Sequence, residues 1–456
     1  QGQAGIKLQN AIPEARIVYV SATGATKVEA LAYAERLGLW QTGDLPFKSR
    51  TDFMASIGNS GVAAMEVVAR DLKALGLYLA RTLSYDGVEY DPLVVTLNDQ
   101  QREIYNAFAD AFQIIHKRID DALEETGADL NSMSKAAARS AFEGAKLRFF
   151  DHLIVGLKTP TLIKAIEQDL EEGRSCLVSL ISTNEAIIDR RLATIPVEEW
   201  NDLHIDVSPR DTILDYLVRC FPVQAHEEFQ DGDEVKSRPL VDGDGNPVLD
   251  KTAVKMRDEL IERLAFLPPV PGALEQILFH FGEENVAEVT GRSRRLLMDK
   301  EEGRIYAASR NSQRANLLET QAFQDGKKRI LVFSDAGGTG RSYHADLSAI
   351  NQQRRSTYML QPGWRADRAC QALGRAHRTS QASAPIFRIV VCQDIPGEKR
   401  FVSTIAKRLF ALGALTRGQR QAAGENMFSA RDDLENEYAH SALLNFLSLM
   451  VLGRFE

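Results

Sequence analysis

Two arginines stand three residues apart in the segment QALGRAHRTSQ, residues 371–381. The guanidinium group is planar and permanently charged, so it can hold the terminal phosphates of a nucleotide and stabilise the charge that develops during phosphoryl transfer. On a helix, Arg375 and Arg378 would share one face with Gln371 and point into one cleft. The spacing predicts a phosphate-binding arginine pair, and the alternative that it leaves open is an exposed basic helix face.

A second candidate site is the glycine-rich stretch SDAGGTGRSYHA, residues 334–345, which follows the apolar run ILVF. Three glycines in four residues let successive backbone N–H groups converge on an anion. The stretch imitates a Walker A loop, but Asp335 stands where that motif needs its first glycine and Arg341 replaces its lysine. We therefore predict a contact to nucleotide or nucleic-acid phosphate that is not a Walker A loop.

Two further segments could touch a ligand. In SATG, residues 21–24, the hydroxyls of Ser21 and Thr23 follow an apolar strand pattern, although an ordinary turn has the same composition. In GRSRRLL, residues 291–297, Arg292, Arg294 and Arg295 form a compact basic patch that suits nucleic acid, with a solvated turn as the alternative.

Charge is distributed unevenly along the chain. The formal net charge is −8, but residues 286–420 hold roughly 24 Lys and Arg against 11 Asp and Glu, about +13, which leaves about −21 elsewhere. A basic region on an acidic protein is typical of a surface that meets phosphates, although solvated helix faces account for part of such an excess.

Composition excludes several other classes. The 456 residues are 44% hydrophobic and 26% charged, as in a globular chain of two or three domains. The four cysteines form no CxxC pair and the eight histidines do not cluster with them, so we predict neither disulfides nor a metal site. A reducing, cytoplasmic setting fits this usage, and no apolar run predicts a leader or a membrane span.

The elements that would position these residues follow an α/β pattern. From residue 151 to 396, a helix at 161–172 precedes short apolar runs at 175–183, 284–291, 329–335, 358–363 and 387–393, which predicts a doubly wound parallel sheet. An acidic insertion at about 196–271 contains VDGDGNPV, residues 241–248, which we interpret as a polar hairpin turn. Residues 397–456 are predicted to form a helical C-terminal tail.

Residues 1–98 have the pattern of the end of an earlier domain. The run IVYV at 17–20 predicts a buried strand, and the sixteen residues before it cannot supply the neighbouring strands that it needs. Residues 99–150 are expected to form a helical arm or linker, capped by Asn98 or Asp99 and broken near 127–131. We therefore expect the chain to be the back part of a larger protein.

The order SATG, SDAGGTGRSYHA and QxxGRxxRxxQ resembles motifs III, V and VI of superfamily 2 helicases. Longer stretches resemble the strawberry notch family: YAERLGLW at 33–40, residues 61–90, NVAEVTGRSRR at 285–295 and residues 397–420. The resemblance covers nearly the whole chain. It implies a Swi/Snf-related core, with a second RecA-like domain at 151–396 preceded by the end of a first RecA-like domain.

The resemblance also implies residue roles. Arg378 would be the arginine finger, Arg375 would contact the γ-phosphate, and Gln371 would couple closure of the cleft to nucleic acid. The nucleotide would also meet Asp335, Gly338 and Gly340, whereas contacts to nucleic acid or coupling to it would involve Ser21, Thr23, Thr339, Arg341, Arg292, Arg294 and Arg295.

The sequence departs from the helicase pattern in one respect, because it contains neither a Walker A nor a DExH motif. ATP hydrolysis needs the lysine and the Mg²⁺ ligands of those motifs. The resemblance thus implies that ATP and Mg²⁺ are held mainly by a first RecA-like domain, and that this chain alone is inactive.

The function expected from the resemblance is that of a C-terminal motor domain of a DNA-dependent ATPase or translocase. Its partners would be nucleic acid, DNA rather than RNA, and the first RecA-like domain. Its location would be the cytoplasm in bacteria or phage-infected cells and the nucleus in eukaryotes. The alternative is a stand-alone, non-catalytic module that binds nucleic acid or a partner ATPase.

Overall fold

The computed structural model describes residues 2–20, 31–40, 45–79, 87–203, 208–232, 234–299, 302–338, 340–361, 366–395, 397–398 and 437–451. The chain divides into two compact units. Unit 1 comprises Gln1–Val94, Asp169–Ile181 and Thr320–Glu456, and unit 2 comprises Val95–Gln168 and Ser182–Glu319. The candidate arginine pair and the glycine-rich stretch both belong to unit 1.

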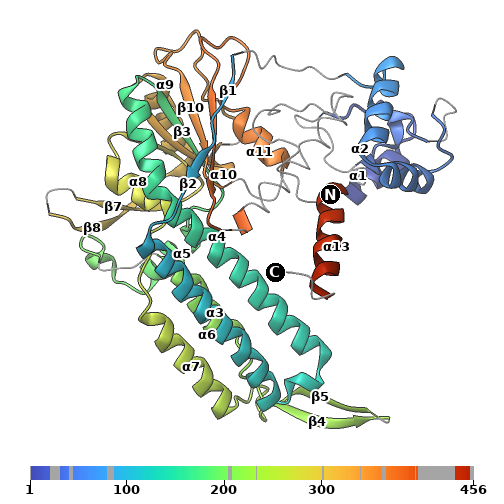
Figure 1. Ribbon diagram of the computed structural model, residues 1–456, viewed down its shortest axis with the longest axis vertical. Coiled ribbons are helices and arrows are strands. Elements are labelled where there is room, and N and C mark those ends of the chain that lie inside the picture. Colours follow the sequence, from blue (N-terminus) through green and yellow to red (C-terminus); the bar gives the residue numbers. More distant parts are fainter. Residues whose placement is uncertain are drawn as a thin grey trace. The chain divides into compact units, whose positions relative to one another are not determined.

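A parallel sheet forms the centre of unit 1 (Figure 1). Its strands lie in the order β1, β11, β10, β3 and β9, and each neighbouring pair is parallel. The strands are β1 Glu89–Tyr90, β3 Ser175–Leu180, β9 Ile330–Ser334, β10 Arg355–Met359 and β11 Ile386–Cys392. Every residue of β3, β9 and β10 is buried, as expected for parallel strands covered on both faces. The predicted α/β fold with a parallel central sheet is confirmed.

The strand order identifies the edge at which a ligand would bind. Strand β3 lies between β9 and β10, so the direction of winding reverses at β3. In open α/β sheets, ligands bind beyond the carboxyl ends of the strands at such a reversal. At this edge Asp335 follows β9, and the side-chain oxygen of Gln361, beyond β10, accepts the N–H of Ile181 at 2.7 Å. The sheet thus brings the glycine-rich stretch to the expected position.

The other described elements of unit 1 are helices: α1 Gly2–Ala11, η2 Glu35–Leu37, α2 Arg50–Ala74, α10 Asp335–Gly338, α11 Ala366–Leu373 and α13 Glu437–Val451. Helix α2 is capped by Ser49, whose hydroxyl accepts the N–H of Asp52 at 3.1 Å. It packs through Phe53 on a separate core that contains Leu39 and Trp40. Of the predicted helical tail, α13 is described, and residues 399–436 lie outside the described residues.

The prediction of a buried strand at residues 17–20 is wrong. The segment has no regular secondary structure and pairs with none of the described strands, and Val18 and Val20 are 82% and 90% exposed. An apolar run forms a strand only where a sheet edge accepts its backbone N–H and C=O groups. Composition alone does not supply that edge.

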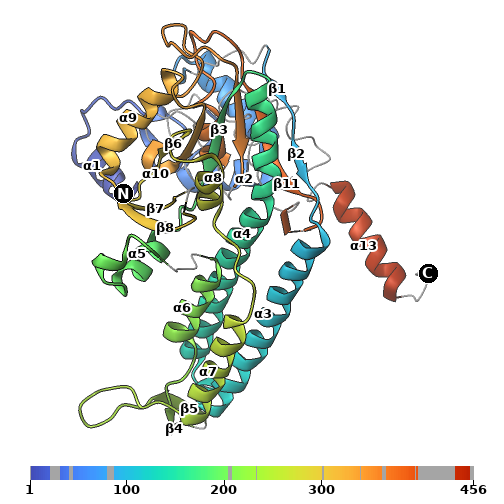
Figure 2. The ribbon, with the colours of Figure 1, turned by 90° about the vertical axis from the view of Figure 1, so that its left-hand side faces the viewer.

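Unit 2 is built around the helices α3 Asp99–Glu125, α4 Ser132–Glu171, α6 Arg210–Cys220 and α7 Lys251–Ala265, which run alongside one another in Figures 1 and 2. Phe112 is at the centre of their core, with ring centroids of Phe149 and Phe150 at 4.8 and 5.0 Å. The antiparallel hairpin of β4 His226–Asp231 and β5 Glu234–Pro239 lies at one end of these helices.

The remaining elements of unit 2 are β2 Leu93–Val95, which begins in unit 1, η3 Ala128–Leu130, α5 Glu185–Ala193, η4 Val197–Glu199, α8 Ala273–Phe281, β6 Val286–Val289, β7 Arg294–Met298, β8 Ile305–Ser309 and α9 Ser312–Gln324, which ends in unit 1.

The predicted polar turn at 241–248 is confirmed, since Asp242 accepts the N–H groups of Asp244 and Asn246, both at 2.9 Å. Within the described ranges, no helix combines the length and the apolar composition needed to cross a membrane.

Two predicted helix boundaries are confirmed and one is wrong. Asn98 caps α3 through a capping box, in which its side chain accepts the N–H of Gln101 at 2.8 Å. The predicted break near 127–131 is the short helix η3. However, the helix predicted at 161–172 is not separate, because α4 continues through Pro160 to Glu171.

Helix α4 tolerates Pro160 because a side chain outside the helix supplies the hydrogen bond that proline cannot donate. Proline has no N–H, so the carbonyl four residues earlier, at Gly156, loses its helical hydrogen bond. The side-chain amide of Gln276 donates to that carbonyl at 3.0 Å and to the carbonyl of Pro271 at 2.8 Å. Gly156 permits this approach, since a Cβ atom there would lie 2.8 Å from Val270 Cγ1 and 2.9 Å from the Pro271 oxygen.

We predict that Gln276→Leu lowers the free energy of unfolding by about 1–3 kcal/mol, because it leaves the carbonyl of the buried Gly156 without a donor. Urea unfolding checks the value. In a Pro160→Ala background the restored N–H of residue 160 satisfies Gly156, so the same substitution should cost less. Equal costs in the two backgrounds would contradict the proposed exchange of donors.

Candidate functional site

The glycine-rich stretch turns sharply at the carboxyl end of β9. Helix α10 begins at Asp335 and ends at Gly338, and Gly340 has a φ of 75°, a conformation that favours glycine. Asp335 lies 3.5 Å from Nη1 of Arg368 on α11. Thr339, like the predicted Ser21 and Thr23, lies outside the described residues.

The two candidate arginines lie just beyond α11, so the prediction that they share a helix face is wrong. The helix ends at Leu373, and the next turn tightens, with the N–H of Arg375 donating to the Ala372 carbonyl at 3.2 Å. The Arg375 carbonyl then accepts the N–H of Tyr343 at 2.7 Å. We call residues 375–382 the arginine turn. Gln371, on α11 itself, is exposed.

Arg375 is a buried cation. It is 7% exposed, and its guanidinium carbon lies 5.5 Å from the ring centroid of Phe333. Nη1 is 3.5 Å from the Arg341 carbonyl oxygen, and Nε has no hydrogen-bond partner among the described residues. Burial lowers the pKa of Arg375, and Tyr343 and Asp335 partly offset this effect. Across the described residues no carboxylate forms an ion pair with Arg375, so its charge is available to a bound anion.

Arg378 has a different environment. Its side chain is exposed, and its backbone N–H donates to the side-chain oxygen of Gln381 at 3.2 Å. That same oxygen lies 3.2 Å from Nδ1 of His377. In the part of the chain that the structure describes, no acidic group pairs with the Arg378 guanidinium. The site therefore combines one buried and one exposed guanidinium.

The predicted basic patch at 291–297 is not a free cationic surface. Arg292 has no exposed surface; its Nη1 contacts Glu275 Oε1 at 2.6 Å and its Nε contacts Glu288 Oε1 at 2.7 Å. Burial opposes ionisation of Glu288, but Arg292 and Arg310 outweigh this effect and lower its pKa to about 2. These four residues form a buried ion cluster in unit 2. We therefore leave Arg292 out of the nucleic-acid contacts proposed below.

The other two arginines of the patch are also paired, although they are less buried. Arg294 Nη1 lies 3.2 Å from Asp189, and its guanidinium stacks 5.1 Å from the ring centroid of Trp200. Arg295 contacts Glu283. A phosphate would have to compete with a carboxylate at each of these positions.

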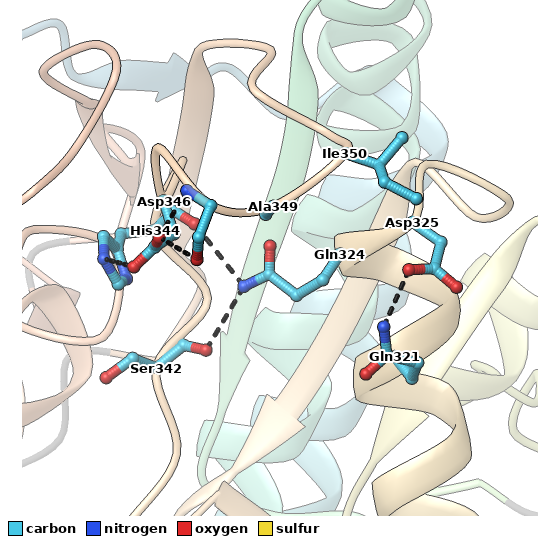
Figure 3. Close-up of a pocket in the computed structure, with 9 residues that line it drawn as sticks. Gln321, Gln324, Asp325, Ser342, His344, Asp346, Ala349 and Ile350 are labelled. Carbon is cyan, nitrogen blue, oxygen red and sulfur yellow. Dashed lines mark hydrogen bonds and ion pairs between the residues drawn. The ribbon is translucent and has the colours of Figure 1, made fainter.

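A polar pocket of about 480 Å³ lies beside the glycine-rich stretch and is drawn in Figure 3. It is lined by Gln321, Gln324, Asp325, Ser342, His344, Asp346, Ser348, Ala349 and Ile350. His344 Nε2 lies 3.0 Å from Asp346, and burial lowers the pKa of His344 against the effect of that carboxylate. The polar side chains that line this pocket include carboxylates and amides but neither Lys nor Arg, so the pocket does not suit a phosphate.

Sequence reasoning missed Phe333 and Tyr343, which contact Arg375, and Gln361, which links β10 to the segment after β3. No spacing marks these residues, because the sheet brings them together. One signal was present for the ion cluster: Glu288 interrupts the apolar run VAEV, and an acid in a buried strand requires a cationic partner.

Known protein families match both ends of the chain. Residues 272–456 match the C-terminal domain on Strawberry notch homologue, and residues 1–107 match the P-loop containing NTP hydrolase pore-1 family. Protein strawberry notch homolog 1 of Rattus norvegicus is 31% identical over 97% of this chain and 40% of its own length. The chain belongs to the strawberry notch family.

Other strawberry notch relatives align over the same extent. Protein strawberry notch homolog 2 of Mus musculus is 30% identical over 99% of the chain and 38% of its own length. Protein FORGETTER 1 of Arabidopsis thaliana is 26% identical over 97% of the chain and 42% of its own length. The chain thus spans about two fifths of these relatives and contains a helicase-like C-terminal region.

We predict that Arg292→Met lowers the free energy of unfolding by about 3–5 kcal/mol, because it leaves the buried Glu275 without its cation and the buried Glu288 with Arg310 alone. The matched change Arg294→Met removes a partly exposed ion pair and should cost about 1 kcal/mol or less. Chemical denaturation of both variants tests the difference. Similar small losses would show that the buried cluster does not stabilise unit 2.

Proposed function

We propose that this strawberry notch chain provides the second motor domain of a DNA-dependent ATPase or translocase, and that a first RecA-like domain completes its nucleotide site. The observation that carries the proposal is Arg375, a buried guanidinium with no paired carboxylate among the described residues, beside a glycine-rich turn. The helicase-like family match over residues 272–456 and the NTP-hydrolase match over residues 1–107 support it.

The two arginines would have different roles. Arg375 is held on the ring of Phe333, so it is suited to contact the γ-phosphate from a fixed position. Arg378 is exposed, so its side chain is free to reach a nucleotide bound on another domain and act as the arginine finger. Gln371 is exposed on α11 and would couple the nucleotide site to nucleic acid.

The residues present fit the phosphate end of a nucleotide but do not fit Mg²⁺. The unpartnered Nε of Arg375 can donate to a phosphate oxygen, and the positive φ at Gly340 lets the backbone turn beside it. In the described residues, no group of three or more His, Cys, Asp or Glu side chains could hold a metal ion. ATP, when bound, supplies the phosphoryl group, and Arg375 and Arg378 would stabilise the charge on it.

Nucleic acid would be contacted by the glycine-rich stretch and the residues around it. Arg341 follows β9 and Gly338 at the ligand-binding edge, and Thr339 lies between Gly338 and Arg341 in sequence. Arg294 and Arg295 would add contacts only if a phosphate displaces Asp189 and Glu283. The excess of basic residues at 286–420 supports phosphate binding of this kind.

We predict that Arg378→Ala, in a protein that carries both RecA-like domains, lowers ATP turnover by about 10³–10⁵-fold while nucleotide binding is retained. Steady-state hydrolysis and equilibrium binding of a labelled nucleotide measure the two effects. Arg314→Ala, which changes an exposed arginine on α9, serves as the control and should leave both unchanged. Normal turnover in Arg378→Ala would remove Arg378 from the mechanism.

We also predict that the chain itself binds DNA with little sequence preference, and that affinity falls steeply between about 50 and 200 mM salt. Fluorescence anisotropy with labelled single-stranded and duplex DNA tests this. Arg341→Ala should reduce the slope of log affinity against log salt by about 1. Lys255→Ala, on the exposed surface of α7, should not change it. No binding at low salt would contradict the nucleic-acid assignment.

A further inference from the structure

Arg355, the first residue of β10, is a second buried cation in unit 1. It is 1% exposed, and its guanidinium carbon lies 4.9 Å from the ring centroid of Phe323. Burial lowers its pKa to about 10, so it is charged at neutral pH. The described residues provide no carboxylate partner for Arg355. Instead, backbone and side-chain oxygens accept hydrogen bonds from its guanidinium group.

Carbonyl oxygens surround the Arg355 guanidinium. Nε donates to the Tyr343 carbonyl at 3.0 Å, and Nη1 donates to the Gln353 carbonyl at 2.7 Å. Nη2 donates to the Asn351 carbonyl at 2.8 Å. Further contacts of 3.1, 3.1 and 3.4 Å reach Asn351 Oδ1, Gln324 Oε1 and the His344 carbonyl. The planar fork of arginine can serve all of these directions, whereas the ammonium of lysine has three donors at one point.

Apart from Gln324, these acceptors belong to one segment, residues 341–353, which begins in the glycine-rich stretch and leads to β10. We call it the connecting segment. It is held from its other side by the arginine turn: Tyr343 N–H donates to the Arg375 carbonyl at 2.7 Å, and Leu347 N–H donates to the Ser380 carbonyl at 3.0 Å. Tyr343 therefore contacts Arg355 through its carbonyl and Arg375 through its N–H.

Gln324, at the end of α9, supports the same arrangement, as Figure 3 shows. Its side-chain nitrogen lies 3.4 Å from the carbonyl oxygens of both Ser342 and His344. Its side-chain oxygen accepts from Arg355. The long distances of the amide contacts make them weak, so of these two side chains the guanidinium of Arg355 holds the connecting segment more strongly.

We propose that Arg355 is a positioning residue for the nucleotide site: it fixes the connecting segment, and the segment in turn fixes the arginine turn that carries Arg375 and Arg378. The inference rests on the proposed function for its effect on hydrolysis. Its structural part, the anchoring of the arginine turn, holds independently of any activity.

The test compares Arg355→Lys with Arg354→Lys. Arg354 is the neighbouring residue. Its guanidinium also donates to carbonyls, those of Ala384 at 2.8 Å and Gly87 at 3.2 Å, and to Glu89 at 2.8 Å, and none of these partners lies in the connecting segment. In a protein with both RecA-like domains, Arg355→Lys should lower kcat about 10²-fold, because small misplacement of a catalytic group has that effect, with the KM for ATP nearly unchanged. Arg354→Lys should leave kcat unchanged.

A second readout uses this chain without nucleotide. Amide hydrogen exchange should be faster in Arg355→Lys at residues 341–353 and 375–382, above all at Tyr343, while the strands β3 and β11 keep their protection. Arg354→Lys should exchange as the unmodified chain does in these two segments. Arg355→Met provides a second variant with no cation, and it should show a larger increase in the same segments.

The outcomes separate the inference from the proposed function. Unchanged exchange at Tyr343 in Arg355→Lys would overturn the positioning role. Where Arg378→Ala does lower turnover, an unchanged kcat in Arg355→Lys or an equal loss of kcat in Arg354→Lys would also overturn it. If Arg378→Ala and Arg375→Ala hydrolyse ATP normally, the proposed function fails instead. Faster exchange in Arg355→Lys would still support the anchoring of the arginine turn in that case.

Discussion

Burying a guanidinium group costs several kcal/mol unless its charge and its five N–H donors are satisfied. Arg292 meets this constraint with two carboxylates, those of Glu275 and Glu288. Arg355 meets it with backbone and amide oxygens. Arg375 is also buried, yet among the described residues it has neither a paired carboxylate nor a partner for Nε. The Phe333 ring and the Arg341 carbonyl offset part of the cost of burying it, and we propose that a bound anion offsets the rest.

The parallel sheet decides where that unbalanced charge lies. Strand order reverses at β3, so the segments after β9 and β10 meet at the edge where open α/β sheets bind ligands. Phe333, within β9, supplies the ring under Arg375, and the connecting segment between β9 and β10 holds the arginine turn by its backbone. The helicase-like C-terminal region of this strawberry notch chain therefore presents its cations from a rigid support.

Much of this arrangement could be predicted from the sequence, because its elements depend on local patterns. Buried parallel strands are continuous apolar runs, and the arginine pair and the glycines stand close together in the sequence. Three features depend on distant partners and could not be predicted. The run at 17–20 lacks a described strand with which to pair. Helix α4 continues through Pro160 because Gln276 donates to the Gly156 carbonyl. The buried Arg292 is paired with Glu275, which lies 17 residues earlier in the sequence.

We propose that Arg375 and Arg378 hold the transferred phosphoryl group. A structure of the protein with both RecA-like domains, bound to ADP and an aluminium fluoride mimic of that group, would test this. Guanidinium nitrogens of both arginines should lie within about 2.7–3.2 Å of the mimic. A mimic held by other cations, with Arg375 still facing only the Arg341 carbonyl and the Phe333 ring, would contradict it.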